Sequence, residues 1–303
     1  MRFLNLVRWP NLLLIIIAQC LIRFALFPSF NAQTALNLWQ FFLLVGSTVT
    51  LAAAGNIIND IYDVQTDSIN KPNRVIVNSL VSESFAYNVF IVLNVIGVGL
   101  GFYLSHAINK PAYFSIFVII SATLYMYASY LKGIALIGNV VIAILVALTL
   151  IIVGLFDLIP AITIYNQNIQ RGVFQIILAY AGVAFLLNLS REIIKDIEDI
   201  NGDYTSGFQT LPILIGRQRT AIVASFFCIT ALGLIVYYVV SQLYNQPIAV
   251  VYYTFFIIGP LIYIVIQLFT AKSVKNYKHI SRLLKLVMLT GLLSLCLYPL
   301  NLC

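Results

Sequence analysis

The sequence has very little charge for its length. Only 9% of its 303 residues are Asp, Glu, Lys or Arg, against roughly 25% in ordinary soluble domains, and 61% are apolar. A chain of this length would need far more polar residues to cover a soluble core. The composition therefore excludes a soluble enzyme, a disordered protein and a disulfide-rich secreted domain, and it indicates an integral membrane protein.

Cysteine and histidine are also scarce. The chain has two histidines and four isolated cysteines that form no CxxC pair, namely Cys20, Cys228, Cys296 and Cys303. We therefore expect free, buried thiols and no disulfide. No convincing Ser/His or Cys/His pair is present, so the sequence gives no reason to expect covalent catalysis by a protein nucleophile.

Nine apolar stretches are each long enough to cross a bilayer core of about 30 Å as a helix. They cover about residues 11–29, 39–58, 84–105, 112–131, 134–159, 172–190, 220–242, 247–270 and 283–302. We therefore predict an all-α polytopic membrane protein, with nine transmembrane helices in one bundle and a single domain over residues 1–303. Arg23 lies in the second half of the first stretch, where we expect its side chain to snorkel toward the far interface.

The basic residues are distributed unevenly between the two sides of this predicted bundle. With the N-terminus inside, all but three of the 17 Lys and Arg residues fall on inner segments, the exceptions being Arg23, Lys110 and Arg171. This asymmetry predicts a multi-pass protein of the cell (inner or plasma) membrane with a cytoplasmic N-terminus. It also explains the net charge of +7 without a nucleic-acid partner. The basic residues between 272 and 285 are interpreted as anchors of this orientation.

Nine of the ten carboxylates lie in or beside two inner segments, each of which continues an apolar helix. They recur at spacings of three and four residues, which places each set on one helical face: Asn59, Asp60, Asp63 and Asp67 in the first segment, and Glu192, Asp196, Asp199 and Asp203 in the second. Stacked like charges are destabilising unless a cation sits among them. Oxygen ligands without His or Cys suit Mg²⁺ bound together with substrate phosphates. Either segment alone would be interpreted as a solvated acidic surface, but the shared spacing favours a site.

These two motifs carry a resemblance to a known family. Together they resemble the paired motifs of the UbiA family of intramembrane prenyltransferases. The first motif is Asn59-Asp60-x-x-Asp63-x-x-x-Asp67, after the second helix, and the second is Asp196-x-x-Asp199-x-x-x-Asp203, after the sixth. The second motif, continued to Thr210-Leu-Pro-Ile-Leu-Ile-Gly216, is most similar to the digeranylgeranylglyceryl phosphate synthase branch. One departure is Arg74-Val-Ile-Val-Asn-Ser79, where the family usually carries two prolines and a glycine.

The resemblance implies a prenyltransferase that uses Mg²⁺ as its cofactor. The metal ligands and catalytic residues would be Asp60, Asp63, Asp67, Asp196, Asp199 and Asp203, and the substrate-binding residues would be Asn59, Arg74, Tyr130, Lys132, Asn139, Asn188 and Lys195. The partners would be membrane lipids, a polyprenyl diphosphate and a lipophilic acceptor, with no nucleic acid and no obligate protein partner.

The acceptor is the open part of this interpretation. The second motif favours geranylgeranylglyceryl phosphate, whose alkylation gives an ether lipid. A quinone precursor, 4-hydroxybenzoate or 1,4-dihydroxy-2-naphthoate, is the alternative within the family. A membrane transporter is the alternative from another class, but transporters usually place their polar sites near the bilayer midplane, whereas the acids here gather at one face.

Overall fold

The computed structural model describes residues 2–72 and 75–300, and within these ranges it contains helices and no strand. Nine helical segments in the described ranges are long and apolar enough to cross a membrane, which confirms the all-α membrane fold. These segments are α2–α3 (Trp9–Ser29), α4 (Leu38–Tyr62), α6 (Glu83–Ala107), α7 with its leading turn (Pro111–Ser129), α8 with its trailing turns (Ile137–Ala161), α9 (Gln167–Thr205), α11 (Arg217–Gln242), α12–α13 (Pro247–Thr270) and α14 with its trailing turn (Val274–Leu297). Short helices lie between them: α1 (Arg2–Leu6), α5 (Val64–Asn70), η4 (Leu131–Gly133) and α10 (Leu211–Ile215).

The polar ends of two helices differ from the apolar stretches in the sequence. Helix α9 continues to Thr205, beyond the end of the apolar stretch at residue 190, as the helical spacing of the second acidic motif predicts. Helix α4 ends at Tyr62, and the chain restarts as α5 after Asp63. The backbone N–H of Asp63 still donates to the carbonyl of Asn59, and that of Asp67 to Asp63 (2.9 and 2.8 Å), so helical spacing persists through the first motif.

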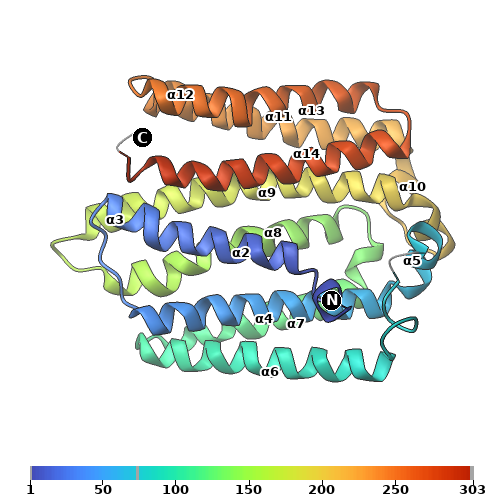
Figure 1. Ribbon diagram of the computed structural model, residues 1–303, viewed down its shortest axis with the longest axis horizontal. Helices are drawn as coiled ribbons and strands as arrows, with labels where there is room; N and C mark the ends of the chain where they lie inside the picture. Colours follow the sequence, from blue (N-terminus) through green and yellow to red (C-terminus); the bar gives the residue numbers. More distant parts are fainter. Residues whose placement is uncertain (1, 73–74, 301–303) are drawn as a thin grey trace.

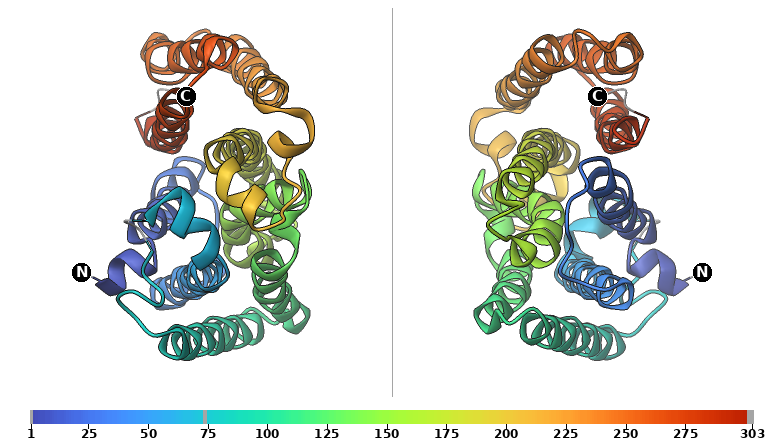
Figure 2. Two further views of the ribbon diagram at one scale, coloured as in Figure 1. Left: turned by 90° about the vertical axis from the view of Figure 1, so that its right-hand side faces the viewer. Right: turned by 90° about the vertical axis from the view of Figure 1, so that its left-hand side faces the viewer.

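The helices run roughly parallel to one long axis, with α9 and α8 near the middle (Figure 1). Helices α11–α13 and α14 lie on one side of α9, and α4, α6 and α7 lie on the other. Helices α5 and α10 sit at the same end of the bundle, as the end-on views show (Figure 2). This end therefore carries the C-terminal ends of α4 and α9, and with them both acidic motifs.

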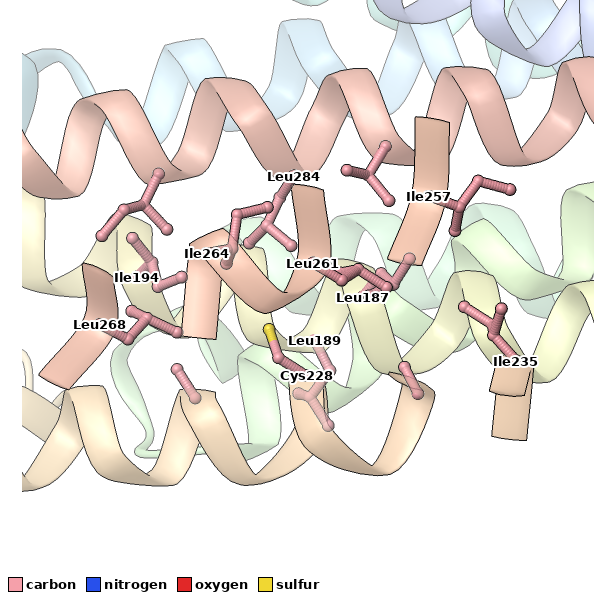
Figure 3. Close-up of a cluster of buried hydrophobic side chains, with 14 of the residues drawn as sticks. Leu187, Leu189, Ile194, Cys228, Ile235, Ile257, Leu261, Ile264, Leu268 and Leu284 are labelled. Atoms are coloured by element: carbon pink, nitrogen blue, oxygen red, sulfur yellow. The ribbon is translucent and has the colours of Figure 1, made fainter. Parts of the chain in front are cut away.

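Apolar packing holds α9, α11, α13 and α14 together. Cys228 of α11 lies among leucine and isoleucine side chains from these helices, including Leu189 and Leu261 (Figure 3). The expectation of free thiols is confirmed for the three described cysteines, but only Cys228 is buried; Cys20 is half-buried and Cys296 is exposed. Cys303 lies outside the described residues.

A buried ion pair closes the opposite end of the bundle. The guanidinium of Arg23 lies 3.0 Å from the carboxylate of Asp157, which is fully buried. Asp157 also accepts a hydrogen bond from the backbone N–H of Leu36 (2.9 Å), and Arg23 donates to the Leu36 carbonyl (3.1 Å). The expectation that Arg23 snorkels to the interface was therefore wrong, because a carboxylate on α8's trailing turn neutralises it inside the protein.

Candidate active site

A cavity of about 1830 Å³ extends through the bundle from the end that carries the acidic motifs. All six aspartates of the two motifs line it. Tyr180 also lines it, sixteen residues before Asp196 on α9, which corresponds to about 24 Å along the helix. The cavity therefore joins a carboxylate-rich end, which we call the acidic end, to an apolar interior of nearly bilayer depth.

Each carboxylate of the first motif that is deeply buried has a cationic partner. Asp60 accepts a hydrogen bond from Arg8, and Asp63 accepts one from Lys132. Asn59 also donates to Asp63, at 2.5 Å. Burial lowers the pKa of Lys132, but the charge of Asp63 outweighs burial, so the pKa of the ammonium lies above its usual value. Lys132 is therefore a firmly charged partner of the first motif.

Asp67, one turn further along α5, has no such direct partner within the described residues. Burial, followed by the nearby charge of Asp63, raises the pKa of the Asp67 carboxyl. A cation placed between Asp63 and Asp67 would relieve this repulsion.

The second motif is held by partners from two other segments. Asn139 of α8 donates to Asp196 at 2.8 Å, and Lys71 donates to Asp199 at 2.6 Å. Asp203 is 4% exposed and lines the same cavity. The two motifs therefore face one space, as their matching helical spacing predicts.

Helix α5 docks against the end of α9 through a close backbone approach at Gly202. A Cβ atom at Gly202 would lie 2.4 Å from Nδ2 of Asn70 and 2.6 Å from the carbonyl of Thr66. The Asn70 amide donates to the Asp199 carbonyl (2.7 Å) and accepts from the Gly202 N–H (2.9 Å). This junction fixes the distance between the two motifs.

The other residues expected to bind substrate fall into three groups. Asn59, Lys132, Asn188 and Lys195 line the cavity. Asn139 does not line it but positions Asp196. Tyr130 is 70% exposed and lies outside the cavity lining, so the structure does not bring it to the site. Arg74 lies outside the described residues.

Four further charged residues line the cavity that the sequence argument did not place there: Arg8, Lys71, Arg191 and Lys285. Glu192, which shares the helical face of the second motif, lines it as well. Lys285 was interpreted as an orientation anchor, yet it lies eleven residues inside α14 and donates to Asn11 at 2.7 Å. Arg8 precedes α2 in a left-handed backbone conformation, and the sequence carries no spacing signal that would place it at the site. For Lys285, the feature of the sequence that could have indicated a site residue is its position inside the apolar stretch 283–302, the last predicted span.

The donor atoms at the acidic end fit a hard divalent cation. They are carboxylate and amide oxygens, and Oδ1 of Asn59 and Oδ1 of Asp63 are buried without a hydrogen-bond partner in the described chain. Within residues 2–72 and 75–300, however, no group of three acidic, histidine or cysteine side chains forms a ready-made metal cage. This arrangement suits Mg²⁺, which binds through one or two carboxylates together with substrate phosphates.

Comparisons with known proteins agree with this geometry. Residues 8–299 match the model of the UbiA prenyltransferase family. The chain is 31% identical over 297 residues to digeranylgeranylglyceryl phosphate synthase of Methanosphaera stadtmanae, covering 96% of this chain and 97% of the relative. It is 30% identical over 249 residues to the enzyme of the same name from Korarchaeum cryptofilum, covering 81% of each.

Solved structures show the same fold at lower sequence identity. One, of a digeranylgeranylglyceryl phosphate synthase, superposes with a TM-score of 0.64 at 23% identity and covers 99% of this chain and 98% of that one. Another, of a UbiA homologue from Archaeoglobus fulgidus bound to DMAPP and Mg²⁺, gives a TM-score of 0.59 at 14% identity, with 97% and 99% covered.

Proposed function

Because the chain belongs to the UbiA prenyltransferase family, we propose that it transfers a geranylgeranyl group from its diphosphate to geranylgeranylglyceryl phosphate, in a reaction that needs Mg²⁺. The prenyltransferase class follows from the family, which decides against the transporter interpretation. The acceptor rests on the names of relatives that match most of the chain. We further propose that residues 1–303 act as a single domain.

One observation carries the site assignment: the aspartates of both motifs line one cavity whose deeper walls are mainly apolar and aromatic, with a few Gln, Ser and Tyr side chains. A prenyl diphosphate has the same division, with a charged head and a hydrocarbon tail. The tail would gain free energy by leaving water for the apolar interior, and the head would remain at the acidic end.

The residues of the two motifs would act together on the diphosphate. Asp60, Asp63, Asp67, Asp196, Asp199 and Asp203 would hold Mg²⁺, which supplies charge neutralisation for the diphosphate as it leaves. Lys132 and Lys71, held beside Asp63 and Asp199, would stabilise the remaining negative charge by charge-assisted hydrogen bonds.

The chemistry requires no protein nucleophile. The allylic C–O bond breaks, and the diphosphate leaves with the bonding electrons. The acceptor hydroxyl then attacks the allylic carbon and releases its proton, which gives an ether. The cavity walls around this step are apolar, including Leu124 and Leu187, and they would keep water from trapping the cation.

We propose that the acidic end faces the cytoplasm. The uneven distribution of Lys and Arg supports this orientation, since inner segments hold all but three of the 17. Both acidic motifs then meet soluble Mg²⁺ and prenyl diphosphate on the side where these are made available.

The test uses membranes that contain the chain, labelled geranylgeranyl diphosphate and Mg²⁺. Geranylgeranylglyceryl phosphate, 4-hydroxybenzoate and 1,4-dihydroxy-2-naphthoate are offered separately, with EDTA and Asp63→Ala as controls. An acid-stable labelled ether lipid with the first acceptor alone supports the proposal. Product with an aromatic acceptor alone would overturn the acceptor, and full activity of Asp63→Ala would overturn the site.

A further inference from the structure

A second charged zone lines the cavity, separate from the acidic end and opposite in sign. We define it as Arg191, Glu192 and Lys195 of α9 together with Lys285 of α14, and call it the cationic zone. Arg191 precedes Asp196 by five residues and Asp199 by eight, so it lies about 8–12 Å deeper along α9 than the second motif. Of these four residues, only Lys195 was expected to bind substrate, and the prenyl-transfer steps described above use none of Arg191, Glu192 and Lys285.

The cationic zone has more positive charge than its own partners neutralise. Glu192 accepts hydrogen bonds from Arg191 (3.0 Å) and from Lys195 (3.0 and 2.8 Å). Lys285 has only the neutral amide oxygen of Asn11 at 2.7 Å. Arg191 and Lys195 line the same cavity as Lys285 and carry the same sign of charge, so they repel its ammonium group. Three cations against one carboxylate leave a formal charge of +2 inside the bundle.

Such a surplus is costly within a membrane protein. Lys285 lies eleven residues into α14, in a membrane-spanning segment and two residues inside the apolar stretch that begins at residue 283. A cation there requires an anionic partner or a polar cavity. Among the described residues, Nε of Arg191 and Nδ2 of Asn188 are also buried donors without an acceptor. The surplus positive charge and the unused hydrogen-bond donors both indicate that this zone binds an anionic ligand.

We propose that the cationic zone binds the phosphate monoester of the acceptor, so that Lys285 and Arg191 select a phosphorylated lipid alcohol over an uncharged or aromatic one. This proposal rests on the proposed function and names its acceptor subsite. A phosphate monoester carries about −1.5 to −2 charges at neutral pH, which matches the surplus. Its three oxygens can accept from the Arg191, Lys285 and Asn188 donors together.

The position of the cationic zone along the cavity also suits the reaction. In a glycerol monophosphate the phosphate lies only a few bonds from the reacting hydroxyl, so it must bind close to the allylic carbon of the donor. The donor diphosphate would occupy the acidic end, and its first carbon would point into the cavity, toward the level of Arg191. The two zones thus keep the two phosphate groups apart while their reacting atoms meet between them.

The test compares Lys285→Met with Lys275→Met, which removes an exposed lysine from the first turn of the same helix. Rates are measured with saturating geranylgeranyl diphosphate and either geranylgeranylglyceryl phosphate or the dephosphorylated geranylgeranylglycerol. We expect Lys285→Met to raise KM for the phosphorylated acceptor by about tenfold to a hundredfold, as for the loss of one hydrogen bond to a charged group. KM for the diphosphate, and the rate with geranylgeranylglycerol, should stay as in the Lys275→Met control. Lys285→Arg should retain the wild-type preference.

Binding gives a second measurement that does not depend on turnover. In EDTA, geranylgeranylglyceryl phosphate should raise the Tm of the wild-type chain and of Lys275→Met but not that of Lys285→Met, whose own Tm reports its folding. An unchanged acceptor KM in Lys285→Met, or a raised KM for the diphosphate instead, would overturn the proposal. Failure of the wild-type chain to alkylate geranylgeranylglyceryl phosphate would instead overturn the proposed function.

Discussion

Replacing Gly202 by alanine should separate the two acidic motifs without touching a charged residue. The new methyl group would meet Nδ2 of Asn70 at 2.4 Å and the Thr66 carbonyl at 2.6 Å, so α5 must move away from α9. The shift breaks the two hydrogen bonds of Asn70, each contributing about 0.5–1.5 kcal/mol. Against this, alanine has a higher helix propensity than glycine, which stabilises α9 by up to about 1 kcal/mol.

Overpacking at the two short contacts adds about 1–3 kcal/mol. The net cost of docking α5 is then at least about 1 kcal/mol, which corresponds to a shift of about fivefold or more toward the undocked state. Hydrogen–deuterium exchange of peptides that cover α5 should therefore accelerate. Because α5 carries Asp67 and leads to Lys71, KM for the prenyl diphosphate should rise in parallel.

Gly233→Ala is the matched control, since Gly233 lies within α11 and nothing lies within 4 Å of its Cβ position. This variant should keep wild-type exchange and activity and gain slightly in Tm. If Gly202→Ala behaves in the same way, α5 does not depend on this contact, and the account of how the motifs are held together is wrong.

Three further predictions follow from the charged contacts. Lys132→Met leaves Asp63 without its cation and removes the charge-assisted hydrogen bond that Lys132 would donate to the diphosphate. Losing such a bond costs about 1.5–3 kcal/mol, so the rate at subsaturating diphosphate should fall by about tenfold or more. Steady-state kinetics measure this, and an unchanged KM for the diphosphate contradicts it. Arg23→Leu leaves the fully buried Asp157 without a cationic partner and should lower the Tm markedly. Adding Asp157→Leu should restore part of the lost Tm. Equal Tm values for Arg23→Leu and the wild type would refute a stabilising pair. Removing divalent cations with EDTA should abolish prenyl transfer yet leave the Tm of the ligand-free chain nearly unchanged. The reason is that most of the motif carboxylates already have cationic or amide partners. A large drop in Tm would show that metal stabilises the fold.

The sequence predicted the membrane fold and the pairing of the motifs because both depend on regular helical spacing. Apolar runs of bilayer length locate spans, and the separation of Asp196, Asp199 and Asp203 defines one face of a helix whatever its neighbours are. The same spacing predicts that α9 extends beyond residue 190, but its end at Thr205 could not be found, since hydropathy does not distinguish a polar helix from a polar loop.

The partners of the acidic residues could not be predicted from spacing. Arg8 is 52 residues from Asp60, and Lys132 is 69 residues from Asp63, so these pairs form only when separate helices meet. The same is true of Arg23 and Asp157, which looked like two unrelated charges in apolar runs. A charge inside a predicted span has a partner elsewhere, but the chain order does not say which one.

The pairing at the acidic end has a consequence for the order in which ligands bind. Among the residues that the structure describes, the six motif aspartates have three cationic partners there, Arg8, Lys71 and Lys132, which leaves a formal charge of −3 before any ligand arrives. A bare diphosphate would be repelled by this charge, so divalent cations must enter first or together with it. The kinetically competent donor is then the metal–diphosphate complex, and diphosphate in excess over Mg²⁺ should inhibit the enzyme by withdrawing metal from the site.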